Sequence, residues 1–194
     1  MQKILTTLFL YLFVNLSLFS QNLDIDILRD INLNRNQNLD NTFKFLSNST
    51  DFVAVAVPVG IFTTGYFLDN KDVMENSLVG AAGVLSAGAL TLIGKNLINR
   101  QRPYEVYILD SFDAGEGKSM PSGHTAIAFS TAMSITLQFN KWYVAIPSFI
   151  WASSVAYSRM HLGVHYPSDV LVGAVVGVAS SYLSFYLQNY FRNK

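Results

Sequence analysis

The sequence predicts an all-α, membrane-embedded bundle, made of an N-terminal signal or anchor helix and five further apolar helices. Of its 194 residues, 51% are hydrophobic and only 13% are charged. The charged residues are unevenly placed, which leaves long uncharged stretches between short polar connections. Each stretch has about 15 to 19 residues, or roughly 22 to 29 Å as a helix, close to the thickness of the hydrocarbon core of a bilayer.

Residues 1–20 resemble a secretory signal peptide or a signal anchor. Lys3 precedes a mostly apolar run that ends at Phe19, and the small residue Ser20 follows as a possible cleavage point. Cleavage is favoured over a retained anchor, because the run is shorter than the ~20 residues of a comfortable span. In both cases the chain after Ser20 is expected to begin outside the cytoplasm.

Residues 21–51 form the most polar part of the chain and are interpreted as an exposed or interfacial segment. Leu39, Phe43 and Leu46 have helical spacing and could lie on a membrane surface. No catalytic pattern occurs in this segment. The helical domain proper is therefore predicted over residues 52–194.

Five uncharged stretches follow in that domain. A buried helix of a soluble protein can reach their length, but five in succession without an internal charge are unusual for one. A soluble all-helical bundle remains the alternative. Small residues spaced four apart, Gly173 with Gly177 and Gly83 with Ala87, would allow close helix contact within lipid. The stretches are residues 52–68, 77–94, 125–139, 142–157 and 170–188.

The orientation of these helices is taken from the N-terminal signal. If Gln21 is outside, the stretches cross the membrane alternately and the chain ends inside. More Lys and Arg residues then lie outside than inside, so the positive-inside rule does not support this orientation by count. Even so, the threading brings three polar clusters to one side of the membrane.

Composition excludes several classes of function. The formal net charge is zero, so no basic excess exists to neutralise a nucleic-acid backbone. The chain has no cysteine, which excludes disulfides, a thiol nucleophile and thiolate metal sites.

The three polar clusters contain all three histidines of the chain together with several cations and one carboxylate of interest. They are KNLINRQRP at residues 95–103, PSGH at 121–124 and SRMHLGVHYPSD at 158–169. Ionisable groups at a membrane edge are functional candidates by default, because leaving them there is costly.

The residue types in these clusters suit the chemistry of a phosphoryl group. Lys95, Arg102 and Arg159 supply positive charge, and arginine has the planar fork that fits phosphate oxygens. Ser122 stands where a helix cap belongs, and the backbone amides of residues 122–124 would form an anion cradle that Gly123 leaves open.

Histidines are the second part of that chemistry. Phosphoryl transfer can use one histidine as nucleophile and another as acid. Asp169, four residues after His165, is placed to fix the tautomer of a nucleophilic imidazole.

The three clusters resemble the signature of the type 2 phosphatidic acid phosphatase superfamily. That signature is Lys, six residues, Arg-Pro; then Pro-Ser-Gly-His; then Ser-Arg, five residues, His, three residues, Asp. Every specified residue is present here, in order and with each internal spacing intact. The resemblance covers about residues 52–188, and it implies a six-helix core with the active site at the outer membrane face.

Roles for individual residues follow from this resemblance. It implies that His165 attacks phosphorus and forms a phosphohistidine, with Asp169 orienting it and His124 acting as acid and then base. It also implies that Lys95, Arg102, Ser122, Gly123 and Arg159 bind the phosphoryl oxygens. No metal or other cofactor is implied.

Other polar residues near the clusters receive structural interpretations. His161 matches no specified position, so packing is favoured over catalysis. Arg100 is interpreted as solvated or facing lipid headgroups. The acidic residues Glu105, Asp110, Asp113 and Glu116 are assigned to a solvated loop over residues 104–120 rather than to a lid.

The function favoured by the sequence is hydrolysis of a lipid phosphate or diphosphate from the outer face of a bacterial inner membrane. Undecaprenyl diphosphate is slightly preferred as substrate, with phosphatidate, phosphatidylglycerophosphate and lipid A also possible. A secreted, soluble acid phosphatase of the same superfamily is the alternative, and a transporter or non-enzymatic membrane protein is a remote one. Lipid is the only partner expected, nucleic acid is not, and the oligomeric state is left open.

Overall fold

The computed structural model describes residues 23–112, 115 and 117–194, and the regular structure in these ranges is helical. The all-α prediction is confirmed. A helix over residues 23–33 comes first. It is followed by η1 (Gln37–Leu39), α2 (Asp40–Phe67), α3 (Lys71–Ile98), α4 (Pro103–Val106), α5 (Gly123–Phe139), α6 (Trp142–His161) and α7 (Pro167–Arg192). The predicted signal or anchor, residues 1–20, lies outside the described residues.

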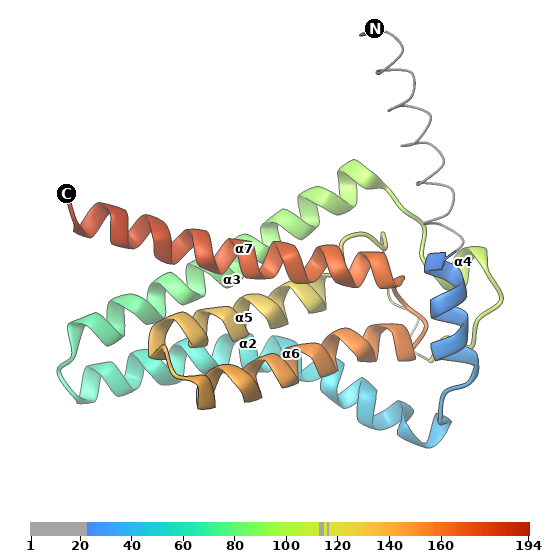
Figure 1. Cartoon of the computed structure of the whole chain (residues 1–194), viewed down its shortest axis with the longest axis horizontal. Helices are drawn as coiled ribbons and strands as arrows, with labels where there is room; N and C mark the ends of the chain where they lie inside the picture. Colours follow the sequence, from blue (N-terminus) through green and yellow to red (C-terminus); the bar gives the residue numbers. More distant parts are fainter. Residues whose placement is uncertain (1–22, 113–114, 116) are drawn as a thin grey trace, which may run out of the picture.

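Five long helices run along a common axis, and the 23–33 helix crosses one end of the bundle near α4 (Figure 1). Helix α5 is central, because it packs against α2, α3, α6 and α7. Its sequence, GHTAIAFSTAMSITLQF, explains this position. The many Ala, Ser and Thr side chains are small enough for neighbouring helices to approach α5 on several sides.

Small residues and serine hydroxyl groups join α5 to α7 and α3. The Ser181 hydroxyl lies 2.6 Å from the Ser130 hydroxyl and 2.9 Å from the Ser134 hydroxyl. A Cβ atom on Gly177 would come within 2.2 Å of the Ala126 carbonyl oxygen. The expected close contact at the Gly173–Gly177 pair is thus present, between α7 and α5.

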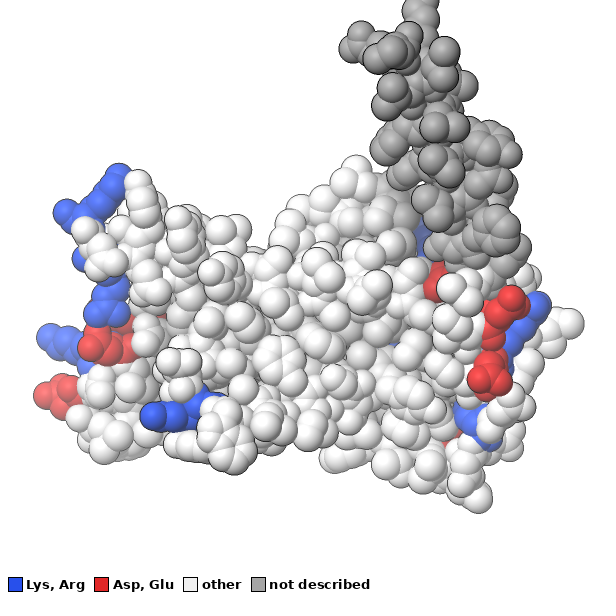
Figure 2. Space-filling view, viewed as in Figure 1, with Lys and Arg blue, Asp and Glu red and all other residues white. Residues whose placement is uncertain are grey.

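On the face shown in Figure 2, the middle of the bundle is free of charged residues, and the visible charges gather at its two ends. Large apolar side chains such as Leu85 and Val175 are more than half exposed there. Among the described residues, three helical stretches are long and apolar enough to cross a membrane: Gln37–Phe67, Lys71–Val106 and Pro167–Arg192. This surface favours the membrane-embedded bundle over the soluble alternative.

The helices are longer than the uncharged stretches that predicted them. Helix α2 begins at Asp40 and has 28 residues, where the sequence suggested a start near residue 52. The polar first turns of α2 are stable as helix because their side chains have partners: Asp40, for example, is buried against Arg35 and His161. In the sequence, the helical spacing of Leu39, Phe43 and Leu46 was the one indication that the chain is helical before residue 52.

Gly177→Ala should destabilise the protein, since its methyl group would press on the backbone of Ala126 and Ser130. Overpacking of this kind costs about 1–3 kcal/mol. We expect the variant to lose its monodisperse peak in detergent at a lower temperature than wild type. Gly60→Ala is the matched control, because a Cβ atom there meets nothing within 4 Å. Equal thermal stability of the two variants would contradict close α5–α7 packing.

Candidate active site

The residues that the sequence predicts as a site all lie at one end of the bundle. Lys95 is in the last turn of α3, and Arg102 immediately precedes α4. Helix α5 starts at Gly123, α6 ends just after Arg159, and α7 starts just before Asp169. Consecutive long helices alternate in direction (Figure 1), so the end of α3, the start of α5, the end of α6 and the start of α7 come together.

His165 and Asp169 form the innermost pair of this site. Nδ1 of His165 lies 3.5 Å from Oδ2 of Asp169, and both side chains are almost completely buried. His165 belongs to the short connection between α6 and α7, and Asp169 to the first turn of α7. The spacing of four residues across this helix start therefore brings the carboxylate to the imidazole.

Residues 117–119 connect the three motif blocks, although none of the blocks contains them. The Gly117 carbonyl accepts a hydrogen bond from Arg102 Nε at 2.9 Å, and the Lys118 carbonyl accepts one from Lys95 Nζ at 2.7 Å. The Ser119 hydroxyl donates to Asp169 Oδ2 at 2.5 Å and lies 3.4 Å from Nδ1 of His165. Their position directly before PSGH was the one available signal.

Arg100 has a different role from the one expected. Its side chain is 25% exposed and forms two ion pairs: Nη1 donates to Asp169 Oδ1 at 2.8 Å, and Nη2 donates to Asp24 Oδ2 at 2.6 Å. Its guanidinium also lies 3.7 Å above the Tyr166 ring. These contacts give Arg100 a structural role that the solvated or headgroup-facing interpretation did not include. The fork of an arginine can bridge two carboxylates from separate helices, which sequence spacing alone does not reveal.

Two further cations lie near His165: Arg102, which immediately precedes α4, and Arg159, in the last turn of α6. Arg102 is 5% exposed and Arg159 is 4% exposed, so both guanidinium groups are buried near the imidazole. Arg159 also donates to the Ser47 hydroxyl on α2. Buried arginines at this site give it a positive potential that suits an anion.

Ser122 is the N-cap residue of α5, as predicted, but its side chain does not cap the helix. Its hydroxyl lies 2.9 Å from the Thr125 hydroxyl, and its backbone amide donates to the Asp169 carbonyl at 3.0 Å. The amides that α5 can offer to an anion therefore begin at Gly123, because the first N–H groups of a helix have no partner within it.

Burial controls the titration of His165. Removal from water lowers the pKa of this imidazole to about 4, the neighbouring Asp169 acts in the opposite direction, and Arg159 and Arg102 lower the pKa further. The imidazole is accordingly neutral at physiological pH and keeps a lone pair available.

A second polar network surrounds the site on the side of residues 23–40. His161 Nε2 lies 2.9 Å from Asp40 Oδ1, and Arg35 forms ion pairs with Asp40 at 2.9 Å and with Asp110 at 3.1 Å. Phe43 packs on the His161 ring at 4.2 Å. These contacts confirm the packing role expected for His161.

The 104–120 loop is tied to its surroundings where it is described. Besides the Arg35 ion pair, Asp110 exchanges backbone hydrogen bonds with the Asn32 side chain at 2.9 and 3.0 Å. Glu105 accepts from the Arg102 amide at 3.1 Å. Asp110 is half exposed, as expected for a solvated loop, but it is also held by Arg35 and Asn32; Asp113 and Glu116 lie outside the described residues.

Between helices of the described part of the chain, apolar grooves open on the membrane-facing surface. One lies between α2 and α3, has a volume of about 640 Å³, and is lined by Asp51, Val55, Leu85, Gly88, Leu92 and Ile127 among others. Leu92 is one helical turn before Lys95, and Ile127 is one turn after His124. This groove therefore leads from the lipid-facing surface toward the site.

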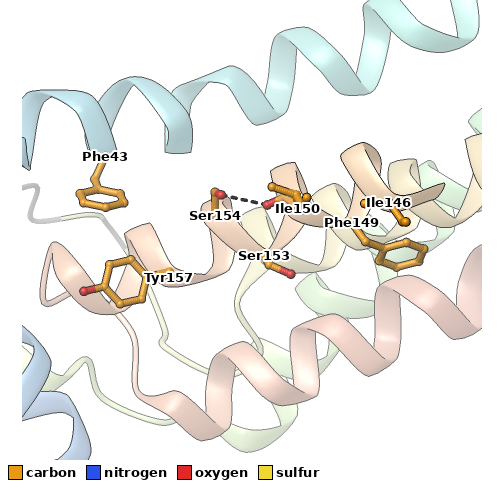
Figure 3. Close-up of a pocket in the computed structure, with 7 residues that line it drawn as sticks. All are labelled: Phe43, Ile146, Phe149, Ile150, Ser153, Ser154 and Tyr157. Atoms are coloured by element: carbon orange, nitrogen blue, oxygen red, sulfur yellow. Dashed lines mark hydrogen bonds between the residues drawn. The ribbon is translucent and has the colours of Figure 1, made fainter. Parts of the chain in front are cut away.

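A second groove lies between α2 and α6 and has a volume of about 670 Å³. Phe43, Ile146, Phe149, Ile150, Ser153, Ser154 and Tyr157 line it (Figure 3). The rings of Phe43 and Tyr157 are 5.2 Å apart. The predicted site residues line neither groove, but Leu92 and Ile127 bring the α2–α3 groove within one helical turn of Lys95 and His124, so this groove is better placed to deliver a substrate.

A model of the PAP2 superfamily matches residues 77–193. A lipid A 4′-phosphatase of Bacteroides thetaiotaomicron is 32% identical over 99 residues, which cover 47% of this chain and 44% of that protein. An undecaprenyl-diphosphatase of Sulfolobus acidocaldarius is 29% identical over 195 residues, which cover 96% of this chain and 90% of that protein.

The fold has a counterpart among solved structures. A transmembrane PAP2-type phosphatidylglycerolphosphate phosphatase of Bacillus subtilis is similar with a TM-score of 0.73 at 22% identity, over 95% of this chain and 96% of that one. The matched region spans about half the length of curated relatives such as the lipid A phosphatase. With its membrane-length helices, the chain is a multi-pass membrane protein. By the match over residues 77–193, it belongs to the PAP2 superfamily, the type 2 phosphatidic acid phosphatase family that its motif blocks predicted.

Proposed function

We propose that this chain is a metal-independent phosphatase that hydrolyses a lipid phosphate or diphosphate through a phosphohistidine. The observation that carries the proposal is the His165–Asp169 pair, buried beside Arg102 and Arg159 at the end of a membrane-spanning bundle. A neutral imidazole with a fixed tautomer is a nucleophile, and clustered cations stabilise a phosphoryl group.

In the first step, Nε2 of His165 attacks phosphorus while Nδ1–H faces Asp169. The N–P bond forms as the P–O bond to the leaving group breaks, and His124, which the negative charge of the bound phosphoryl group would keep protonated, donates its proton to the leaving oxygen. In the second step, neutral His124 takes a proton from water, and the resulting hydroxide attacks phosphorus. The N–P bond then breaks, which releases phosphate and returns neutral His165.

Binding of the phosphoryl group is assigned to the surrounding donors. Lys95, Arg102 and Arg159 would offset the charge on its oxygens, and the Gly123 amide and Ser122 hydroxyl would donate hydrogen bonds. Among the described residues, no three His, Asp or Glu side chains form a group that could hold a metal ion. Independence from metals is a prediction of this proposal, and activity in the presence of a chelator tests it.

A lipid substrate follows from the placement of the site. The α2–α3 groove would hold an apolar chain while the headgroup reaches Lys95 and His124. An isoprenoid diphosphate such as undecaprenyl diphosphate is the preferred candidate, since one relative that matches nearly the whole chain is an undecaprenyl-diphosphatase. We further propose a bacterial inner membrane as the location, with the site at the outer face.

The first test is phosphate release in detergent micelles with EDTA present. We expect wild type to hydrolyse undecaprenyl diphosphate faster than phosphatidate and much faster than a soluble aryl phosphate. His165→Asn should be reduced by at least about 10³-fold, because it removes the nucleophile. Correct folding of the variant is checked by size-exclusion chromatography.

Three outcomes would oppose the proposal. Turnover of the aryl phosphate alone would favour a broad acid phosphatase, and loss of all activity with EDTA that Mg²⁺ restores would remove metal independence. Absence of phosphate release from every substrate by a well-folded wild type would refute the enzyme assignment.

The low pKa of His165 predicts the acid side of the pH profile. His165 must be neutral to attack, so nucleophilic activity is present above its pKa of about 4 and is lost as pH falls through that value. The acid limb of kcat/KM, which reports the free enzyme, should therefore lie near pH 4 rather than near the pKa of about 6.5 of an ordinary histidine. A limb near pH 6.5 would contradict a buried, neutral nucleophile.

Gly88→Leu tests the route of the lipid chain. A Cβ atom at Gly88 meets nothing within 4 Å and Gly88 lines the α2–α3 groove, so leucine is expected to extend into the groove. We expect kcat/KM for the long-chain lipid to fall about 10-fold or more, and turnover of a short-chain phosphate to stay unchanged. Gly60→Leu, outside the groove, is the control. Equal effects on both substrates would exclude the groove as the tail site.

A further inference from the structure

The 23–33 helix contributes a buried carboxylate next to the proposed active site, although this helix lies outside the region that matches the family model. Asp24 Oδ1 accepts a hydrogen bond from the Ser168 amide at 2.8 Å, and Oδ2 accepts one from the Ser168 hydroxyl at 2.5 Å. Asp24 is therefore fixed to the first turn of α7, one residue before Asp169.

Arg100 connects Asp24 to Asp169. Nη2 donates to Asp24 at 2.6 Å, whereas Nη1 donates to Asp169 Oδ1 at 2.8 Å and to the Ser168 hydroxyl at 2.7 Å. The guanidinium plane rests on the Tyr166 ring, which limits its freedom to rotate. A lysine could not reproduce this geometry, because its ammonium group is a single point of charge.

The two oxygens of Asp169 have separate partners. Oδ1 is held by Arg100, while Oδ2 accepts from the Ser119 hydroxyl at 2.5 Å and the Tyr166 amide at 3.0 Å and faces His165. Arg100 can therefore act on the imidazole through the carboxylate without contacting either the imidazole or the substrate.

We propose that Arg100 and Asp24 are positioning residues that fix the orientation of Asp169 and the share of its charge that reaches His165. The inference rests on the proposed function, in which His165 is the nucleophile. Arg100 neutralises part of the Asp169 charge from the Oδ1 side, and Asp24 balances Arg100 in turn. Through this chain, the N-terminal helix regulates the basicity of the nucleophile.

The sign of the effect follows from the charges around His165. Asp169 on α7 favours the imidazolium, while Arg159 on α6 and Arg102 before α4 oppose it, and Ser119 is a neutral neighbour. His124 on α5 and Lys95 on α3 lie at the same end of the bundle. Removing Arg100 leaves Asp169 with its full charge, so protonation of His165 becomes easier and the neutral nucleophile is lost at a higher pH.

The test compares Arg100→Gln with wild type on the lipid substrate that wild type hydrolyses. We expect kcat to fall about 10- to 100-fold with little change in KM, the range expected for loss of a charge-assisted hydrogen bond. The acid limb of kcat/KM should also move to higher pH, by about half a unit or more. A purely structural role would lower the amount of active enzyme and leave the limb in place.

Further variants separate this inference from simple misfolding. Asp24→Asn keeps the shape of the side chain and should lower kcat less than Arg100→Gln without moving the limb upward, because the positive charge remains. Asp26→Asn, exposed on the same helix, is the matched control and should behave as wild type. Arg100→Lys keeps the positive charge, so its acid limb of kcat/KM should lie near that of wild type, while its kcat should remain below that of wild type. If Arg100→Gln does not fold, Arg100→Lys and Asp24→Asn decide the question.

Additivity gives the strongest criterion. In an Asp169→Asn background, Arg100→Gln should add little further loss, because its effect passes through the carboxylate. A full additional loss in that background, or an unchanged acid limb in a folded Arg100→Gln, would overturn the inference while wild-type turnover upholds the proposed function. An inactive wild type would instead refute the proposed function itself.

Discussion

The buried carboxylate of Asp169 is the group on which this end of the molecule depends. An ionised carboxylate without partners is very costly away from water, so it must be surrounded by donors and cations. Here those partners come from distant parts of the chain: Arg100 after α3, Ser119 before α5, and Tyr166 before α7. Satisfying one charge thereby fixes the relative positions of three segments.

Close packing of α5 against α7 fixes how near the start of α5 lies to the start of α7, and these two helix starts carry part of the site. The Ser122 amide donates to the Asp169 carbonyl, and a Cβ on Gly173 would come within 2.6 Å of the Ser122 carbonyl oxygen. Glycine is therefore required at this contact, and it brings the PSGH block against the first turn of α7. A larger residue would separate His124 from the His165–Asp169 pair.

Exposed apolar side chains and charged side chains occupy different parts of the bundle. Exposed apolar side chains surround its middle, while the charges gather at its ends (Figure 2). At the site end, Arg35, Asp40, Asp110 and His161 form a network that ties residues 23–40 to the 104–120 loop and to α6. The proposed nucleophile is thus held from the N-terminal side as well as from the family core.

The sequence by itself determined the helical class and the residues of the candidate site. Long uncharged stretches can satisfy their backbone only as helices in a bilayer, and the motif blocks were recognisable from spacing within each block. Alternation of the helices was enough to place Lys95, His124 and His165 on one side.

Tertiary structure decided the contacts between blocks. The bond from Arg100 to Asp24 joins residues 76 positions apart, and the bond from Ser119 to Asp169 joins residues 50 apart. No local pattern encodes such pairs, because they depend on how closely helices pack and how a loop folds back. For the same reason the sequence did not reveal the ion pairs of Arg100, and it predicted too late a start for α2. The partners that stabilise the charged residues in both places are distant in sequence and adjacent only in the folded bundle.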